Sequence, residues 1–171
     1  MHPVLKDLPS PDCHYLSAAL GWAGLGNLEE AEAELDKVSK DNRRNRDILS
    51  LIWDIKGKNN KWEQSVNIAE ELIAVEPEIP DGWIYRSFSL HELQRTEEAW
   101  ENLIMVADRF NDNWTIPYNL ACYACQLDQL ADAQEWIVRA MKIEGVETIR
   151  ERSMEDPDLT PLQDIIRTLK P

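Results

Sequence analysis

The chain has 171 residues, of which 43% are hydrophobic, so it can form one compact domain or one short repeat array around a continuous core. Eighteen Lys and Arg against 32 Asp and Glu give a net charge of −14, which disfavours nucleic acid and anionic membrane surfaces as partners. Three cysteines are too few for a secreted disulfide framework, and without a secretory signal or an apolar run of about 20 residues we expect a cytoplasmic protein.

Residues 1–11 precede the first helical pattern and contain spaced prolines, which predicts an extended N-terminal arm. Four small residues then mark the same place in four successive helical patterns, at one constant interval: Ala31, Ser65, Ala99 and Ala133. A unit as long as the interval from Ala31 to Ser65 holds two short helices. Such a pair stacks against copies of itself to bury its apolar faces. The sequence therefore predicts four helix-turn-helix repeats over residues 12–145, at about 12–45, 46–79, 80–113 and 114–145.

Turn-forming residues separate the helices of the predicted repeats. Gly26 interrupts the helical pattern of the first repeat, and Asn60 ends a polar turn in the second. In the third repeat Asp81 follows Pro80, and we expect it to cap the first helix.

The repeat period stops after Gly145, so we predict a C-terminal capping segment over residues 146–171. The sequence from Thr160 to Gln163 has the form of a capping box with a proline at the first helical position. This pattern predicts a terminal helix over residues 161–169 that covers the end of the stack.

These patterns resemble the tetratricopeptide repeat (TPR) family, in which an aromatic residue opens the first helix, a small residue follows one turn later, and an alanine lies early in the second helix. Trp83, Ser87 and Ala99 match this pattern, and Pro77 stands where the closing proline belongs. Trp53 departs from it, because the family has a small residue there. The resemblance implies an all-α fold, a right-handed α-α superhelix (TPR solenoid) of four helix-turn-helix repeats with a capping helix.

In the resembling family the first helix of each repeat lines a concave groove. The resemblance therefore implies a non-catalytic scaffold that binds a protein or peptide segment in this groove. Projection of the first helices gives the expected contacts, which are Leu16, Leu20, Leu51, Asp54, Ile84, Tyr85, Phe88, Tyr118, Asn119 and Cys122. An apolar groove with few charges suits an extended or helical peptide whose apolar side chains enter pockets.

Two other functions remain open. A small acidic TPR-like chain is similar to the cytosolic chaperones of type III secretion, which hold a secreted client. Alternatively, the chain self-associates as a homodimer or fills its groove with its own N-terminal arm, because residues 3–9 carry spaced apolar residues between prolines.

Catalysis is not predicted by any motif. Cys122 and Cys125 lie one helical turn apart, which permits a metal or redox role, but a structural zinc site needs four ligands and the sequence offers no second pair at ligand spacing. His91 and Glu92 are adjacent on one helix and do not face each other. We therefore expect no enzymatic activity, no metal and no cofactor, with thiol chemistry kept as a third alternative.

The sign of the side-chain charges reverses toward the end of the first predicted repeat. The acidic residues around Glu32 are followed by a basic stretch at Arg43, Arg44 and Arg46. Such runs form either solvated faces or contacts with a charged partner, and the first interpretation is the commoner one.

Overall fold

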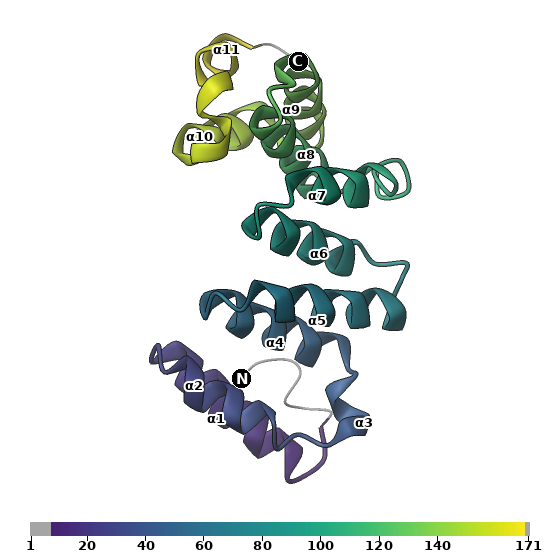
Figure 1. The fold of residues 1–171 in the computed structure, drawn as a ribbon, viewed down its shortest axis with the longest axis vertical. Helices are drawn as coiled ribbons and strands as arrows, with labels where there is room; N and C mark the ends of the chain where they lie inside the picture. Colours follow the sequence, from purple (N-terminus) through teal and green to yellow (C-terminus); the bar gives the residue numbers. More distant parts are fainter. Residues whose placement is uncertain (1–7, 170–171) are drawn as a thin grey trace. The chain divides into compact units, whose positions relative to one another are not determined.

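The computed structural model describes residues 8–169, and every regular element in this range is a helix. The helices are α1 (Asp12–Gly24), α2 (Leu28–Leu35), α3 (Lys40–Arg43), α4 (Arg46–Lys58), α5 (Trp62–Val75), α6 (Pro80–Glu92), α7 (Thr96–Ile104), α8 (Thr115–Gln126), α9 (Leu130–Glu144), α10 (Val146–Glu155), the 3₁₀ helix η2 (Pro157–Leu162) and α11 (Gln163–Thr168). The helices of the pairs α1–α2, α4–α5 and α8–α9 lie side by side (Figure 1). Within residues 8–169 no helix is long and apolar enough to cross a membrane.

The predicted repeat period is confirmed in the helix positions. Helices α2, α5, α7 and α9 start at the same constant interval, and the small residue of the repeat is the fourth residue of each. Each of these residues has none of its surface exposed: Ala31, Ser65, Ala99 and Ala133. A larger side chain at this place would collide with the neighbouring helix, which explains why only alanine and serine occur there.

The same period governs the turn before each of these helices. Four residues with positive φ follow one another at this interval: Gly26, Asn60, Gln94 and Asp128. The residue after each one donates its backbone N–H to a carbonyl five residues earlier, as Asn27 does to Trp22 and Arg95 does to Leu90. This is the Schellman ending of a helix, which satisfies the last carbonyl groups and reverses the chain.

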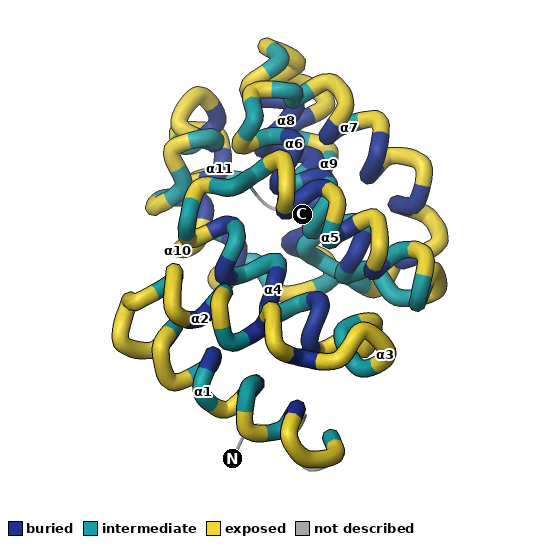
Figure 2. The backbone as a smooth tube through the Cα atoms, turned by 60° about the horizontal axis from the view of Figure 1, so that its bottom comes forward, coloured by how far each residue is buried: buried dark blue, intermediate teal, exposed yellow. Residues whose placement is uncertain are grey.

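The chain divides into two compact units, Met1–Ser89 and Leu90–Pro171, and we describe each by itself. This division falls inside α6, so the predicted repeat boundaries and repeat number stay a prediction. In the first unit, helices α1, α2 and α4 share one core, made by Leu16, Ala19, Ala31, Leu35, Val38, Ile48, Ile52 and Ile55. Buried positions recur along α4 between more exposed ones, as an amphipathic helix requires (Figure 2). Residues 1–7 of the predicted N-terminal arm lie outside the described residues.

A short helix that the sequence analysis did not predict, α3, joins the first two helix pairs. Asp12 fixes this connection, because its carboxylate accepts hydrogen bonds from the backbone N–H of Ser39 at 3.2 Å and from Asn42 Nδ2 at 2.7 Å. The hydrogen bonds from Ser39 and Asn42 lower the pKa of Asp12. The buried carboxylate of Asp12 thereby joins the start of α1 to α3 and to Ser39, the residue before α3.

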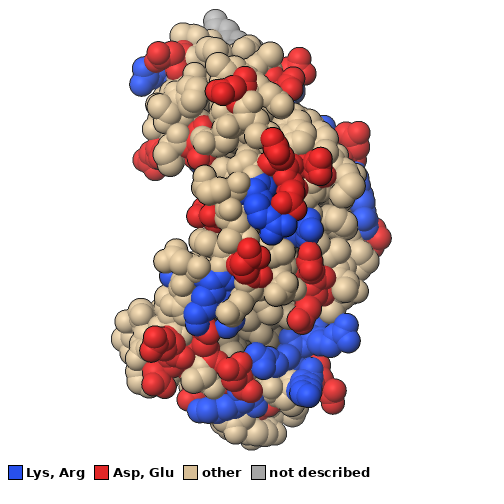
Figure 3. Space-filling model, viewed as in Figure 1, with Lys and Arg blue, Asp and Glu red and all other residues tan. Residues whose placement is uncertain are grey.

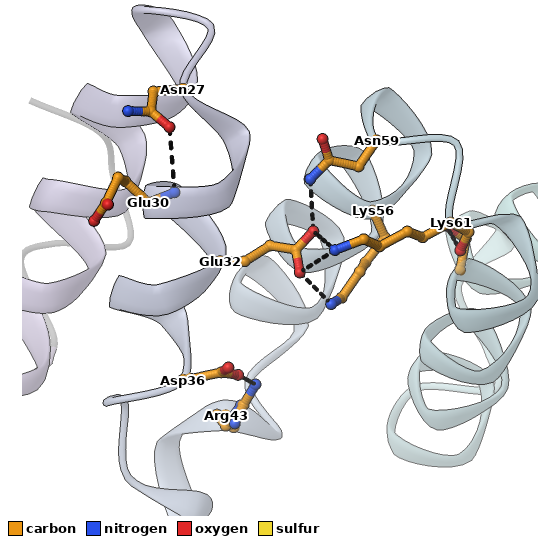
Figure 4. Close-up of polar contacts among 9 residues, drawn as sticks. Asn27, Glu30, Glu32, Asp36, Arg43, Lys56, Asn59 and Lys61 are labelled. Carbon is orange, nitrogen blue, oxygen red and sulfur yellow. Dashed lines mark hydrogen bonds and ion pairs between the residues drawn. The ribbon is translucent and has the colours of Figure 1, made fainter.

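Glu32 on α2 joins the first helix pair to the second (Figure 4). Its side chain is 14% exposed, and its carboxylate lies 2.7 Å from Lys56 Nζ and 2.9 Å from Lys61 Nζ. Asn59 Nδ2 also donates to it, at 2.6 Å. Burial raises the pKa of Glu32, but the hydrogen bonds from Lys56, Asn59 and Lys61 outweigh it and lower this pKa to about 2. Part of the acidic run is therefore an internal contact between helices.

Close packing sets the position of the first turns of α6 on α5. A Cβ atom on Gly82 would lie 2.8 Å from Ile73 Cγ1 and 2.9 Å from the backbone nitrogen of Ile73. Asp81 does not cap α6 as predicted, because it lies inside the first turn, where its carboxylate pairs with Arg46 Nη2 at 2.5 Å. Arg46 is therefore a structural residue that holds α6 to the start of α4.

The end of the second unit corrects one prediction. The terminal α-helix is Gln163–Thr168 rather than residues 161–169, and Pro161 lies inside the preceding 3₁₀ helix. The predicted capping box does not form because both of its side chains bond elsewhere. Thr160 Oγ1 donates to the carbonyl of Pro157, and Gln163 Nε2 donates to the carbonyls of Ser153 and Met154.

Candidate functional site

Five of the predicted contact residues lie half-buried on α4 and α6 of the first unit, namely Leu51, Asp54, Ile84, Tyr85 and Phe88. Two others on α1 are placed differently. Leu16 is 1% exposed and belongs to the core, so its prediction as a groove contact is corrected: its side chain points between α1, α2 and α4. Leu20 is partly buried against the same core.

An aromatic cluster occupies the region where α4, α5 and α6 meet. The indole of Trp53 stacks on the Tyr85 ring, with centroids 3.9 Å apart and planes 6° apart. Trp53 Nε1 donates to Ser89 Oγ at 2.9 Å, and Ser89 Oγ donates to the carbonyl of Tyr85 at 2.8 Å. Trp53 stands where the resembling family has a small residue, and this stacking shows how the first unit accommodates it. The cluster is fixed by both ring contacts and hydrogen bonds.

A pocket of about 300 Å³ opens beside this cluster. Its lining residues are Trp53, Asp54, Gly57, Lys58, Trp62 and Phe88. Phe88 meets both indoles edge to face, with centroids 6.1 Å from Trp53 and 5.7 Å from Trp62. The volume is at the lower end of the range for ligand pockets, a size suited to a side chain rather than to a large cofactor.

Gly57 determines the position of Trp62. A Cβ atom built on Gly57 would lie 2.8 Å from Trp62 Cζ3, so only glycine lets the indole rest against α4. Asp54 and Lys58, which also line the pocket, pair at 2.6 Å, with Lys58 exposed and Asp54 half-buried. The pocket, which we call the aromatic pocket, thus offers ring surfaces to an apolar group and one charge of each sign to a polar neighbour. Burial and the nearby Asp81 raise the pKa of Tyr85.

In the second unit, the predicted contacts on α8 are covered by the chain itself. Tyr118 and Cys122 are buried, and the residues after α10 pack over them. Tyr118 Oη donates to Asp156 Oδ2 at 2.8 Å, and Gln126 Nε2 donates to the carbonyl of Asp158 at 3.3 Å. The prediction of an open groove at Tyr118 and Cys122 is therefore wrong, and of the three predicted α8 residues only Asn119 is half-exposed.

The two thiols on α8 lack the properties of reactive cysteines. Burial, together with the carboxylates of Asp156 and Asp158, raises the pKa of Cys122 well above the usual range. Burial and the same carboxylates raise the pKa of Cys125 to about 11. Redox thiols and metal ligands need a stabilised thiolate, and these surroundings act in the opposite direction.

One group of side chains in the described part of the chain has the spacing of metal ligands. Cys122 Sγ and a carboxylate oxygen of each of Asp156 and Asp158 lie within 4.8 Å of one another. The two carboxylates already make hydrogen bonds within the chain. Asp156 Oδ1 caps the N–H of Asp158 at 3.0 Å, and Asp158 Oδ2 lies 3.1 Å from His91 Nε2. His91 therefore contacts Asp158 rather than Glu92.

Four residues of the aromatic pocket were not among the contacts expected from the sequence: Trp53, Gly57, Lys58 and Trp62. Gly57 lies within a helical pattern of the sequence, five residues before Trp62. An isolated glycine in a helix often marks a close approach of another group, and this signal would have drawn attention to the place where Trp62 lies.

No protein-family model matches the sequence, and no curated protein matches it either. Solved structures do match the fold. One of them is MamA of Desulfovibrio magneticus RS-1, in a structure that runs from residue 41 of MamA to the end of MamA. The two chains share 13% identity over 94% of this chain and 93% of that chain, with a TM-score of 0.70.

Two further solved structures are similar over most of their lengths. YrrB, a TPR protein with an unusual peptide-binding site, shares 13% identity over 86% of this chain and 76% of that chain, with a TM-score of 0.69. TTC0263, a thermophilic TPR protein in Thermus thermophilus, shares 12% identity over 91% and 95% of the two chains, with a TM-score of 0.65. At these identities the similarity establishes the fold.

Proposed function

From the tetratricopeptide-repeat fold of this chain, we propose that it is a non-catalytic scaffold that binds a segment of a partner protein at the aromatic pocket of its first unit. The partner places one apolar side chain, aromatic or aliphatic, against Trp53, Trp62 and Phe88. Stacked helix pairs with an apolar surface between them are suited to extended or helical peptides. The peptide-binding site named for YrrB supports a peptide as the ligand class.

The observation that carries this proposal is the rigid construction of the aromatic pocket. Its walls are held by the stacking of Trp53 on Tyr85, by the bond from Trp53 to Ser89 and by the contact of Trp62 with Gly57. A preformed pocket binds more tightly than a flexible one, because fewer side chains lose freedom when the ligand enters. We expect micromolar affinity, about −8 kcal/mol, for a short peptide.

Native co-purification with identification of partners by mass spectrometry tests the proposal. The unchanged chain is compared with Phe88→Ala, which removes one wall of the aromatic pocket, and with Leu25→Ala, which removes a leucine that is 78% exposed in the turn after α1. We expect partners that Phe88→Ala loses and Leu25→Ala keeps. Identical sets of partners for all three chains would contradict the proposal, provided that circular dichroism shows each variant folded.

The same experiment separates the other functions that the sequence left open. A secreted client that becomes insoluble without this chain would favour the chaperone function. A dimer of the chain in solution that Phe88→Ala dissociates would favour self-association. An affinity that rises when residues 1–7 are removed would favour occupation by the N-terminal arm, which lies outside the described residues apart from its last residues. The cytoplasmic location stays a prediction.

A further inference from the structure

The basic stretch that follows the acidic helix divides into two parts in the structure. Arg46 is held by Asp81, and so its charge serves the packing of α6. Lys40, Arg43 and Arg44 instead surround a second pocket of the first unit, of about 330 Å³. Lys and Arg side chains gather in Figure 3 near the place that α3 occupies in Figure 1. On a chain with a net charge of −14, this local group of cations needs an explanation.

Two of these cations have no partner of their own among the described residues. Arg43 Nη2 pairs with Asp36 at 2.8 Å, which offsets its charge. Lys40 and Arg44 are exposed, and neither takes part in an ion pair within residues 8–169. They are available to a carboxylate of a partner, and an exposed ion pair of this kind makes a small favourable contribution.

The floor of this pocket is apolar. Leu49, Ile52 and Ile68 line it, and the first two are core residues of α4 with 1% and 3% of their surface exposed. Glu71 stands on the α5 side. A ligand with a negative group is therefore attracted to the α3 side and repelled from the α5 side, which fixes its orientation.

We infer that this pocket, which we call the α3 pocket, docks a segment of a partner protein that carries an aliphatic side chain next to Asp or Glu carboxylates. The aliphatic side chain covers Ile68 and the edges of Leu49 and Ile52, while a carboxylate lies between Lys40 and Arg44. An acidic peptide offers both groups in one segment, whereas a simple anion would leave the apolar floor unused. Nucleic acid would bring many phosphates to an acidic protein and is disfavoured by its net charge.

The α3 pocket is separate from the aromatic pocket. Leu49 and Ile52 on α4 line the first, whereas Trp53, Asp54 and Gly57 line the second. The inference therefore does not rest on the proposed function, and each can fail alone.

Selection from a displayed library of random peptides tests the inference, with the unchanged chain as bait, followed by fluorescence anisotropy on the enriched peptides. Arg44→Glu reverses one cation of the α3 pocket. The matched control is Lys142→Glu, which makes the same change in net charge at an exposed lysine of α9 in the second unit. Phe88→Ala reports on peptides that use the aromatic pocket instead.

We expect one class of enriched peptides to combine Leu, Ile or Val with neighbouring Asp or Glu. These peptides should bind Arg44→Glu about tenfold more weakly, lose affinity as salt rises, and bind the Lys142→Glu and Phe88→Ala chains nearly as well as the unchanged chain. Enrichment of no such class, or equal binding to Arg44→Glu and Lys142→Glu, would overturn the inference. A dimer of the chain that Arg44→Glu dissociates would overturn it in favour of a second copy.

Discussion

Among single residues, Gly57 determines how closely Trp62 approaches α4 in the aromatic pocket. Gly57→Ala places a Cβ atom 2.8 Å from Trp62 Cζ3, so the indole must move away from α4. We expect a loss of about 1–2 kcal/mol in the free energy of unfolding, because the overpacking exceeds the gain of up to about 1 kcal/mol that alanine gives in a helix. Denaturant unfolding measures the loss, and tryptophan fluorescence detects the moved ring.

Gly21 provides the matched control for this substitution. It lies inside α1, and a Cβ atom there would meet nothing within 4 Å. Gly21→Ala should therefore stabilise the chain by about 0.5–1 kcal/mol through helix propensity alone. If both substitutions stabilise the chain equally, the contact between Gly57 and Trp62 does not constrain the first unit.

Glu32 makes the stability of the first unit depend on pH. The pKa of Glu32 is about 2 in the folded chain, whereas the ordinary value for glutamate is 4.5, so the folded chain favours the ionised form. The stabilisation is complete above pH 4.5 and is lost as the pH falls from 4.5 toward 2. We expect Glu32→Gln to cost at most about 3 kcal/mol at pH 7, since one pKa unit corresponds to about 1.4 kcal/mol.

Unfolding curves at pH 7, 4.5 and 2.5 measure this dependence. The difference between the unchanged chain and Glu32→Gln should shrink as the pH falls, because protonation removes the same charge that the substitution removes. Glu30→Gln is the control, since Glu30 lies on the same helix, is exposed and makes no ion pair among the described residues. A difference that stays constant with pH would show that Glu32 acts through packing alone.

At the scale of elements, the four Schellman turns differ in how well their residues suit a positive φ. Glycine occupies the first turn, while Gln94 adopts a φ of 61° in the third. A side chain in this region costs about 1–2 kcal/mol, and glycine avoids most of this cost. Gln94→Gly should raise the free energy of unfolding by about 1 kcal/mol, and Gly26→Ala, at a φ of 77°, should lower it by a similar amount. Thermal unfolding of both variants measures these two changes. Shifts of Tm with the same sign would contradict the prediction.

The segment from Asp156 to Leu159 shields the thiols of α8. Asp156→Ala removes the acceptor of Tyr118 Oη and the cap of the Asp158 N–H. Since each loss costs about 1–2 kcal/mol, the segment should open more often, and Cys122 should react with a thiol reagent at least about tenfold faster. The control is Asp164→Ala, whose carboxylate is exposed and pairs with Arg167. Equal reaction rates for the two variants would mean that Asp156 does not hold this segment closed.

The paired helices could be predicted from the sequence because their signals are local, whereas the short connecting helix α3 was not predicted. Ala31 and its counterparts recur at a fixed interval, and each lies at the fourth position of its helix. The cover over Tyr118 could not be predicted, because it is made by a segment 38 residues further along the chain. The same limit applies to Leu16, since a helix face becomes core or surface only when its neighbours are known.

For the whole molecule, the fold was more predictable than the binding surfaces. The repeat period predicts which helices pair. A pocket depends instead on the positions and contacts of individual aromatic and charged side chains. Trp53 was noted only as a departure from the resembling family, yet its stacking on Tyr85 forms one wall of the aromatic pocket. Arg44 and Arg46 stand two residues apart in one basic run, but Arg44 lines the α3 pocket whereas Arg46 forms an ion pair with Asp81. Only the contacts in the structure distinguish these two roles.

The net charge of −14 should make the stability of the whole chain depend on salt. Repulsion among the excess carboxylates opposes the compact state, and raising the ionic strength from about 0.01 to 0.1 M shortens the screening length from about 30 to 10 Å. We expect the Tm at pH 7.5 to rise by about 2–4 °C, which corresponds to roughly 1 kcal/mol for a chain of this size. At pH 5, close to the isoelectric point of about 4.6, the same change in salt should leave the Tm nearly constant. Differential scanning calorimetry measures both. A Tm that falls with salt at pH 7.5 would mean that attractive ion pairs, such as those of Glu32, outweigh the general repulsion.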